Sequence, residues 1–453
     1  MNVREVKAIT QVLGEFRSTC RVLPPPISYQ TPRSTVYVLE RGNGVREATV
    51  RRLEKEIEAA LASVRGEAVP VRFLSSPFAI SVPRPDPQDI PIRPLLNKIR
   101  PVPGALLLGL GEHYNHAASA GGNGALPQLL QVNLLAPTTP HMLLAGTTGA
   151  GKTVALKNAL LMGAVANSPA EVRYILLDPK GRDFPILDGL PHLAAPIMTA
   201  PEQMLGGLRA LVGLLDQRNQ EYGELVNRVG AYRATQEAHR ITDPQILVCI
   251  DEVADLVDLL GDEAGKAVKR LLQIGRGLGI HLLLGTQKPE ASFISGIALA
   301  NIPVRGCGTV VTVEQGKYAT GVPGSILGAH KLTGRGDFIL TINGSKLHPF
   351  QAGRIEDGEE SGLVQAIRRR YSAEKSTWML DFQAAPLAPA APAERSFAPV
   401  HDELVRDLVQ RAQATGQAPS GNQARKLYQE KYRKELNPIT ARTLAGRAAE
   451  LLN

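Results

Sequence analysis

The 453-residue sequence is poor in aromatic residues, which make up 4% of the chain and include a single tryptophan. Because single-strand binding proteins stack bases on aromatic rings, this scarcity argues against base stacking as the main mode of a nucleic-acid contact. Cysteine is scarce too, and Cys20, Cys249 and Cys307 lie far apart without a metal-binding spacing. We expect each to be a small buried apolar residue rather than part of a disulfide framework.

Long apolar runs are also missing from the sequence. None approaches the ~18 residues that a membrane-spanning helix needs. The N-terminal residues 1–12 have mixed charge and lack the apolar core of a signal peptide. These absences predict a cytoplasmic protein without an integral membrane segment. The net charge of +8 mildly favours a polyanionic partner such as nucleic acid.

What the sequence does contain is a complete phosphate-binding loop at residues 146–153, which read Gly-Thr-Thr-Gly-Ala-Gly-Lys-Thr. An apolar run of the buried-strand type precedes the loop and a helix-forming stretch follows it, so its N–H groups can surround phosphate oxygens at a helix N-terminus. We expect Lys152 to reach the β- and γ-phosphates of ATP and Thr153 to ligate Mg²⁺. The predicted nucleotide-binding residues are Gly146, Thr147, Thr148, Gly149, Ala150, Gly151, Lys152 and Thr153.

A second motif of the nucleotide-hydrolysing type lies about a hundred residues downstream. The apolar run 246–250 ends in Asp251 and Glu252, and polar residues that follow parallel strands gather at the ligand-binding edge of a sheet. We expect Asp251 to hold Mg²⁺ and Glu252 to orient and deprotonate the attacking water.

Further polar residues follow or flank the neighbouring apolar runs. Gln287, after the run 282–285, is placed to bond both the γ-phosphate and the catalytic water. Arg276 and Arg305 flank that run, and either could act as an arginine finger on a neighbouring subunit's ATP. Asp178 ends another run, where a contact to the nucleotide site and a turn role are equally reasonable.

The order of apolar runs predicts an α/β fold. Between residues 136 and 355, short runs alternate with helical patterns, which is typical of a mainly parallel sheet with helices on both faces. The expected strands are 141–145, 173–178, 246–251, 280–285, 308–313 and 337–342. The expected domains are an α+β subdomain (1–135), the ATPase domain (136–383), an Ala/Pro-rich linker (384–399) and a helical domain (400–453).

Taken together, the motifs resemble one family. The motor domain of the FtsK/SpoIIIE double-stranded DNA translocases is similar to residues 140–355, and the strand–helix–strand pattern of 30–135 resembles that family's smaller subdomain. The motifs that carry the resemblance, in chain order, lie at 146–153, 176–180, 189–193, 250–252, 279–282, 286–289, 300–305 and 334–337.

The resemblance implies a RecA-like motor in a homohexamer, with duplex DNA in the pore and ATP between subunits. It implies that Arg276, just before the Gly-Ile-His segment, is the arginine that acts in trans, with Arg305 second. It also implies DNA contacts at Lys288 and Lys317, in the loops that follow two of the strands. One departure is Leu299, where the family typically has lysine.

The C-terminal region occupies the place of the family's DNA-reading domain. Its basic residues fall on the second and third of three helical patterns, and Arg425, Lys426 and Arg442 are the DNA-contact candidates. The region is predicted either to bind DNA in the manner of a helix-turn-helix or to form a solvated helical bundle for protein contacts.

Three functions stay open at this point. The first is an ATP-hydrolysing hexameric motor that translocates double-stranded DNA, for example for a plasmid, mobile element or phage. The second is a single-stranded DNA motor or coupling ATPase of the HerA or conjugative type. The third is a DNA-binding or loading protein that uses ATP only as an assembly switch.

Overall fold

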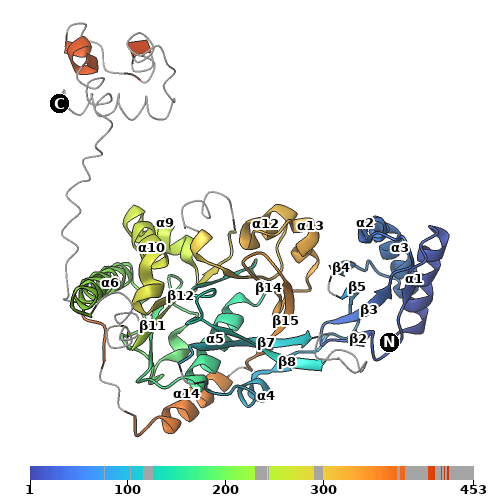
Figure 1. Ribbon diagram of the computed structural model, residues 1–453, viewed down its shortest axis with the longest axis horizontal. Coiled ribbons are helices and arrows are strands. Elements are labelled where there is room, and N and C mark those ends of the chain that lie inside the picture. The colour runs from blue at the N-terminus through green and yellow to red at the C-terminus, as the bar shows by residue number, and fades with distance from the viewer. Residues whose placement is uncertain are drawn as a thin grey trace. The chain divides into compact units, whose positions relative to one another are not determined.

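The computed structural model describes residues 1–75, 77–102, 104–115, 126–229, 242, 244–289, 299–356, 358–374, 378–382, 407–413, 420, 423 and 426–427. The chain divides into two units, residues 1–386 and 387–453. The first unit holds two sheets, and the ribbon in Figure 1 shows the smaller sheet near the N-terminus.

The smaller sheet is built from the first part of the chain. Its strands run in the order β1-β3-β5-β4, with β2 pairing β3, and all its pairings are antiparallel. One face packs on the apolar sides of α1 and α3, where Ile9, Leu13, Ile57 and Leu61 are fully buried. The elements are α1 (Val3–Glu15), β1 (Arg21–Val22), β2 (Tyr29–Gln30), β3 (Ser34–Glu40), α2 (Glu47–Arg51), α3 (Glu54–Arg65), β4 (Arg72–Ser75) and β5 (Phe78–Pro83).

The larger sheet has ten strands in the order β10-β11-β12-β9-β13-β14-β15-β7-β8, and β6 pairs β15. The five strands from β10 to β13 are parallel, whereas the path from β13 through β14, β15 and β7 to β8 is antiparallel. Its strands are β6 (Ile90–Pro91), β7 (Leu107–Asn115), β8 (Leu126–Asn133), β9 (Met142–Ala145), β10 (Val172–Leu177), β11 (Gln245–Ile250), β12 (Ile280–Thr286), β13 (Val304–Cys307), β14 (Asp337–Ile342) and β15 (Leu347–Arg354).

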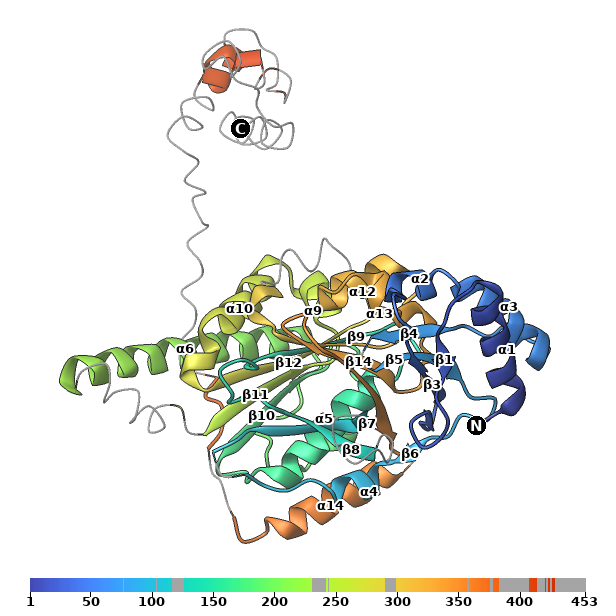
Figure 2. The same ribbon diagram turned by 45° about the vertical axis from the view of Figure 1, so that its right-hand side comes forward.

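Helices cover both faces of this sheet (Figure 2). Residues of α4, α5 and α14 pack on one face and residues of α6, α9 and α10 on the other. The alternation of β10 accounts for the two layers, because Tyr174 and Leu176 belong to the first and Ile175 and Leu177 to the second. The remaining elements are α4 (Ile92–Leu96), α5 (Lys152–Ala166), η1 (Pro185–Leu187), α6 (Pro201–Val229), α9 (Val253–Leu260), α10 (Asp262–Ile274), η2 (Gly275–Leu278), η3 (Leu299–Asn301), α12 (Val313–Thr320), α13 (Gly324–Leu327), η4 (Ala329–Lys331) and α14 (Glu359–Arg370).

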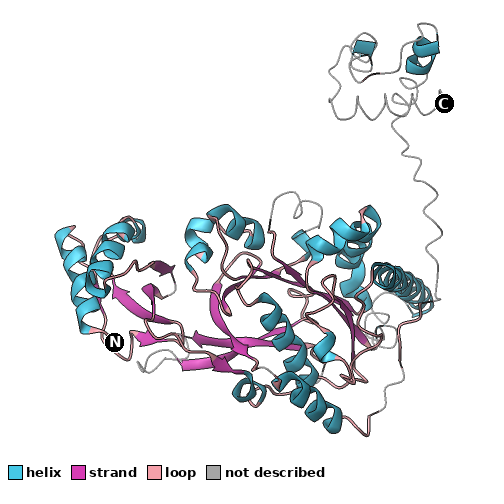
Figure 3. Ribbon diagram, turned by 180° about the vertical axis from the view of Figure 1, so that it is seen from behind, coloured by secondary structure: helices cyan, strands magenta, loops and turns pink. Residues whose placement is uncertain are grey.

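Specific contacts join the N-terminal sheet to the larger sheet. Lys331 of η4 donates to Glu58 at 2.7 Å and to the Val71 carbonyl at 2.8 Å. Arg33 donates at 3.3 Å to the carbonyl oxygen of Arg335, just before β14. The view from behind in Figure 3 shows the two sheets next to each other.

The predicted α/β fold with helices on both faces is confirmed, but the sheet is mixed. The strand expected at 308–313 is wrong: the strand is β13 at 304–307, and Thr312 then caps α12 through a capping box with Gln315. The apolar residue Val310 misled the prediction, because it is buried in a loop that packs on other apolar residues.

The expected boundary near 135 also differs from the structure. Strands β7 and β8 lie before that residue, yet they extend the ten-stranded sheet through the pairing of β7 with β15. The small sheet ends with β5 at residue 83. A pairing between segments more than two hundred residues apart leaves no local pattern in the sequence.

Cys20, Cys249 and Cys307 are buried free thiols, as expected. Within the described part of the chain, no helix is long and apolar enough to span a bilayer. The Ala/Pro-rich segment 384–399 lies outside the described residues, as do most of 400–453. Of the three predicted C-terminal helices, residues 407–413 of the first and residues 423, 426 and 427 of the second are described and are helical.

A buried cluster of Glu5, Arg65 and Tyr37 makes the stability of the N-terminal part testable. Glu5 is 1% exposed, accepts from Arg65 at 2.7 Å and also accepts from the Tyr37 hydroxyl. Glu5→Ala leaves the buried guanidinium unpaired, so we expect a loss of about 3–5 kcal/mol in unfolding free energy. Urea denaturation measures it.

The matched control is Glu15→Ala at the exposed end of the same helix, which should change stability by at most about 0.5 kcal/mol. Equal losses in the two variants would contradict a stabilising role for the Glu5–Arg65 pair.

Candidate nucleotide site

The phosphate-binding loop lies between β9 and α5, as the sequence predicts. Gly149 and Gly151 have φ values of +84° and +91°, which favour glycine because side chains disfavour that region. Backbone bonds join the loop to the end of β12 and to the segment after β13, since Gly146 N donates to Thr286 O at 3.1 Å and Thr147 N to Thr309 O at 2.9 Å.

A second loop donates backbone hydrogen bonds to the phosphate-binding loop. Residues 334–336, just before β14, all have positive φ. Arg335 N donates to Gly149 O at 2.9 Å and Gly336 N donates to Ala150 O at 2.8 Å. A Cβ at Gly151 would come within 2.5 Å of Gly336 N, so the close approach requires glycine there. The sequence marked 334–337 only as a motif, and this holding role was missed.

Lys152 and Thr153 meet Asp251 at the carboxyl edge of the parallel strands. The Lys152 ammonium is 3% exposed, donates to Asp251 Oδ1 at 2.9 Å and also donates to the Asp251 carbonyl. Thr153 Oγ1 donates to the same Oδ1 at 3.0 Å. The structure thus brings together the two predicted motifs, which are a hundred residues apart in the chain.

Glu252 lies beside this pair, fully buried. Both of its carboxylate oxygens accept from Gln287 N, at 3.0 and 2.9 Å. Lys152 and Lys180 place ammonium nitrogens 3.8 and 3.6 Å from Oε2. Burial raises the pKa of Glu252 above its ordinary value, against the lowering effect of Lys152 and the hydrogen bonds. A raised carboxyl pKa suits a general base near neutral pH.

Gln287 extends the site to the rim of the phosphate loop. Its Oε1 accepts from Thr148 Oγ1 at 3.1 Å, while its backbone N–H binds Glu252. Gln287 therefore contacts the phosphate loop with its side chain and the carboxylate with its backbone, which is where a group that contacts both γ-phosphate and water is expected.

The oxygens at this point fit Mg²⁺. Asp251 Oδ2 is buried and has no hydrogen-bond partner among the described residues, although its Oδ1 and Thr153 Oγ1 are in contact. A buried carboxylate oxygen left unpaired is costly unless a cation or donor meets it. Hydroxyl and carboxylate oxygens are ligands that Mg²⁺ prefers, so Thr153 and Asp251 suit the role predicted for them.

Asp183 is a residue of this site that the sequence did not reveal. Burial, followed by the nearby charge of Asp251, raises the pKa of Asp183, and Lys152 opposes this. A second carboxyl group whose pKa responds to Asp251 adds to the demand for a cation. Only the folded loop brings Asp183 here, so no spacing rule could have found it.

Asp178 has the turn role rather than a contact with the nucleotide loop. Its carboxylate is fully buried and accepts from the backbone N–H groups of Lys180, Gly181, Asp183 and Phe184. It shapes the loop that carries Lys180 and Asp183 to Glu252 and Asp251, and so positions both.

The two candidate arginines differ in their surroundings. Arg305 donates to the carbonyls of Ile302, Thr320 and Leu299, so its guanidinium anchors its own chain. Arg276 lies exposed in η2, before β12. The seven residues of β12 put it roughly 20 Å from the carboxyl edge, on the side opposite the phosphate loop.

The predicted DNA contacts are only partly described. Lys288 is exposed and pairs with Asp255 at 3.2 Å. Lys317 is exposed on α12, so the loop expected at 313–317 is a capped helix. Lys426 is exposed and helical, whereas Arg425 and Arg442 lie outside the described residues.

Comparison with known sequences supports the family resemblance. Residues 131–291 match the model of the FtsK/SpoIIIE family. DNA translocase FtsK of Tropheryma whipplei (strain TW08/27) is 28% identical over 377 residues, 81% of this chain and 48% of the relative. DNA translocase FtsK of Staphylococcus aureus (strain Mu50 / ATCC 700699) is 29% identical over 383 residues, 82% of this chain and 46% of the relative. The chain spans about half the length of these curated relatives.

Solved structures agree on the fold. The conjugation coupling protein TcpA of pCW3, in its monomer form with ATPγS, has a TM-score of 0.50 at 17% identity and covers 81% of this chain and 99% of its own. EssC (ATPases 2 and 3) from Geobacillus thermodenitrificans has a TM-score of 0.50 at 15% identity, covering 62% and 52%. The predicted RecA-like α/β fold is therefore confirmed, while the family resemblance depends on the match over residues 131–291.

The raised pKa of Glu252 gives a pH-dependent prediction. The base must be ionised, so kcat at saturating ATP should fall as pH drops through a midpoint above the ordinary glutamate value of 4.5. Bound phosphate charge shifts the midpoint in the same direction. Steady-state hydrolysis from pH 8 down to the onset of acid unfolding, followed by circular dichroism at each pH, measures it. A midpoint at or below 4.5 would remove Glu252 from the role of base.

Proposed function

We propose that this chain, with its FtsK/SpoIIIE motor segment, is an ATP-hydrolysing motor that translocates double-stranded DNA through the pore of a homohexamer. The observation that carries the proposal is the convergence of Lys152, Thr153, Asp251, Glu252 and Gln287 at one edge of the parallel strands. Such a set is sufficient for phosphoryl transfer, which needs positioning and charge neutralisation more than covalent chemistry.

Each side chain has a distinct task in ATP hydrolysis. Lys152, released from Asp251 when the nucleotide enters, neutralises β- and γ-phosphate charge. Thr153 and Asp251 hold Mg²⁺, which supplies further neutralisation of the phosphates. Glu252 orients the attacking water and accepts its proton, and Gln287 contacts the γ-phosphate and transmits its loss to the rim of the subunit.

The position of Arg276 supports a ring rather than a single working subunit. Because it lies at the sheet edge opposite the phosphate loop, it is out of reach of the ATP of its own subunit. An arginine at that edge serves catalysis when the next subunit presents its nucleotide to it. In the homohexamer each ATP then lies between two chains, which couples hydrolysis to movement between neighbours.

Duplex DNA is proposed as the substrate on the family resemblance and the net charge of +8. Phosphate contacts are sensitive to salt and independent of sequence. A processive motor requires this independence of sequence. Lys288 and Lys317 are the proposed pore contacts, and the C-terminal region with Arg425, Lys426 and Arg442 is a proposed second DNA contact.

Duplex DNA should stimulate ATP hydrolysis more than single-stranded DNA of equal nucleotide content. Glu252→Gln should retain ATP binding and lose at least about 100-fold in hydrolysis. A coupled phosphate-release assay measures both. Stimulation of hydrolysis by single strands alone would favour the single-stranded DNA motor or coupling ATPase. A Glu252→Gln variant that keeps its biological function without hydrolysis would favour the ATP-switched loading protein.

A mixing experiment tests the arginine in trans. Arg276→Ala should bind ATP but lose about 10³-fold or more in hydrolysis. Coexpression with Lys152→Ala, which supplies Arg276 but lacks the lysine of the phosphate loop, should restore part of the activity, because some mixed interfaces combine an intact Lys152 with an intact Arg276. The control is Arg270→Ala on the exposed side of α10, where the arginine pairs with Asp216. Activity that no mixture restores would exclude action in trans.

A further inference from the structure

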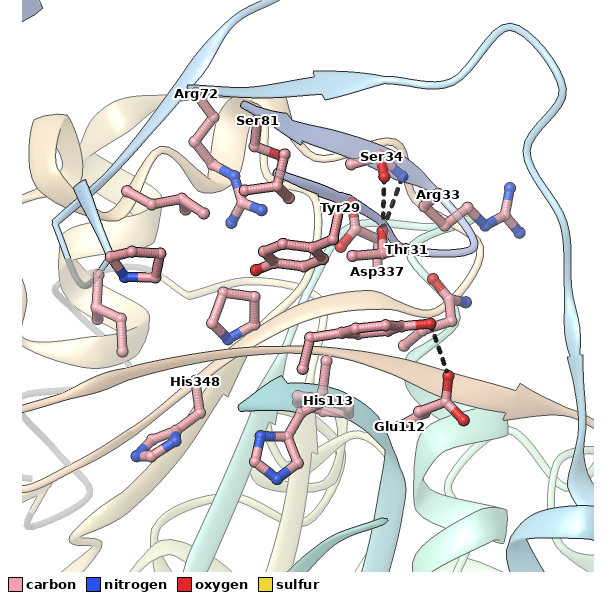
Figure 4. Close-up of a pocket in the computed structure, with 18 of the residues that line it drawn as sticks. Tyr29, Thr31, Arg33, Ser34, Arg72, Ser81, Glu112, His113, Asp337 and His348 are labelled. Atoms are coloured by element: carbon pink, nitrogen blue, oxygen red, sulfur yellow. Dashed lines mark hydrogen bonds between the residues drawn. The ribbon is translucent and has the colours of Figure 1, made fainter. Parts of the chain in front are cut away.

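A separate cavity lies between the N-terminal sheet and the antiparallel part of the larger sheet. Its volume is about 330 Å³, and none of the residues 146–153 lines it. The small sheet contributes β2 to β5, while β7, β14 and β15 contribute the other wall. Figure 4 shows Arg72 and Ser81 on one side of the lining residues and His113 and His348 on the other. The nucleotide site makes no use of this cavity.

Arg72 is the first side chain that requires an occupant. It is 8% exposed, and its Nη1 is buried without a hydrogen-bond partner among the described residues. Figure 4 shows its side chain reaching toward Tyr29. Asp337 also lines the cavity and its charge acts on Arg72, but no ion pair or hydrogen bond joins the two side chains among the described residues. A buried guanidinium with an unmet N–H is costly unless an acceptor meets it, and an anion is the acceptor that also offsets the charge.

Gln351 is the second such side chain. It is 6% exposed, and its Oε1 is buried without a partner in the described structure. Its Nε2 donates to the carbonyls of Arg335 at 2.9 Å and Ala352 at 3.3 Å, which fixes the orientation of the amide. Arg33 also lines the cavity, and its Nε is buried without a partner too. The lining residues therefore carry two unmet donors, on Arg72 and Arg33, and one unmet acceptor, on Gln351.

Aromatic rings complete the wall. Tyr29 and Tyr114 are stacked with ring centroids 5.6 Å apart, and His113 meets His348 edge to face at 6.3 Å. Burial lowers the pKa of both histidines, so at neutral pH they are uncharged and offer ring surface. Such a wall suits a flat ring more than a flexible chain.

We propose that this cavity binds a small ligand with an anionic group on Arg72 and a flat ring carrying a hydrogen-bond donor toward Gln351. The volume lies at the lower end of the ~300–1,000 Å³ of small-molecule pockets, which suits a mononucleotide or an aromatic carboxylate. The anion is a phosphate or a carboxylate, since a guanidinium binds both in the same planar fashion.

The test is isothermal titration calorimetry on the full chain with two anionic probes, adenosine monophosphate and 4-aminobenzoate. Each carries a ring and an amino donor. Their uncharged counterparts are adenosine and 4-aminobenzamide. At least one anionic probe should bind at one site per chain, and its counterpart should bind at least about tenfold more weakly. Binding of adenosine monophosphate would identify the anion as a phosphate, and binding of 4-aminobenzoate would identify it as a carboxylate.

Variants locate the binding. Arg72→Gln should weaken the anionic probe at least about tenfold, while Arg52→Gln, an exposed arginine outside the cavity, should leave it unchanged. Leu74→Trp, which fills the cavity but keeps Arg72, should also block binding and serves if Arg72→Gln fails to fold. Lys152→Ala should bind as the wild type does, so the result is independent of the ATPase proposal. Saturation by neither probe, or binding that survives both Arg72→Gln and Leu74→Trp, would overturn the inference.

Discussion

The structure depends on the burial of one positive charge. Lys152 is almost wholly removed from solvent, and a buried ammonium is tolerated only where carboxylates and carbonyls meet it. Asp251 and Glu252 supply these groups because β11 runs parallel to β12, which in turn pairs with β9, so the motifs that follow β9 and β11 come to one edge. In the proposed function, a nucleotide that draws Lys152 toward its phosphates would take it from Asp251 and from Glu252, 3.8 Å away, and so would change the charge that Glu252 meets.

The antiparallel half of the sheet supports the same site. The loop before β14 takes up the carbonyls of Gly149 and Ala150 with the N–H groups of Arg335 and Gly336, and three consecutive positive φ angles are needed to aim both N–H groups. The carbonyl of Arg335 in turn accepts from Arg33 of the N-terminal part and from Gln351 of β15. Hydrogen bonds through Arg335 therefore connect the phosphate loop to the small sheet. A movement of that sheet relative to the larger sheet would act on the phosphate loop through these bonds.

The features that could be predicted from the sequence are those encoded by short segments of the chain. The glycine loop, the Asp251–Glu252 pair and Gln287 follow apolar strands, and parallel strand ends gather at one edge, so their convergence could be anticipated. The positions of Asp183 and Lys180, and the hydrogen bonds from residues 334–336 to the phosphate loop, could not be anticipated. Each depends on the conformation of a loop, which hydrophobic periodicity does not encode. The strand expected at 308–313 failed for a related reason, since apolar residues of loops and of strands look alike in a short run. The place of β7 and β8 depends on pairing with β15, far along the chain.

The proposed function requires that ATP hydrolysis is converted into movement along a duplex. The most direct measurement is displacement of a third strand from linear duplex DNA, with the triplex placed at increasing distances from the loading end. We predict that displacement requires hydrolysable ATP and begins after a delay that grows with distance. Displacement that is independent of distance, or hydrolysis without displacement, would contradict the translocation of duplex DNA by this chain.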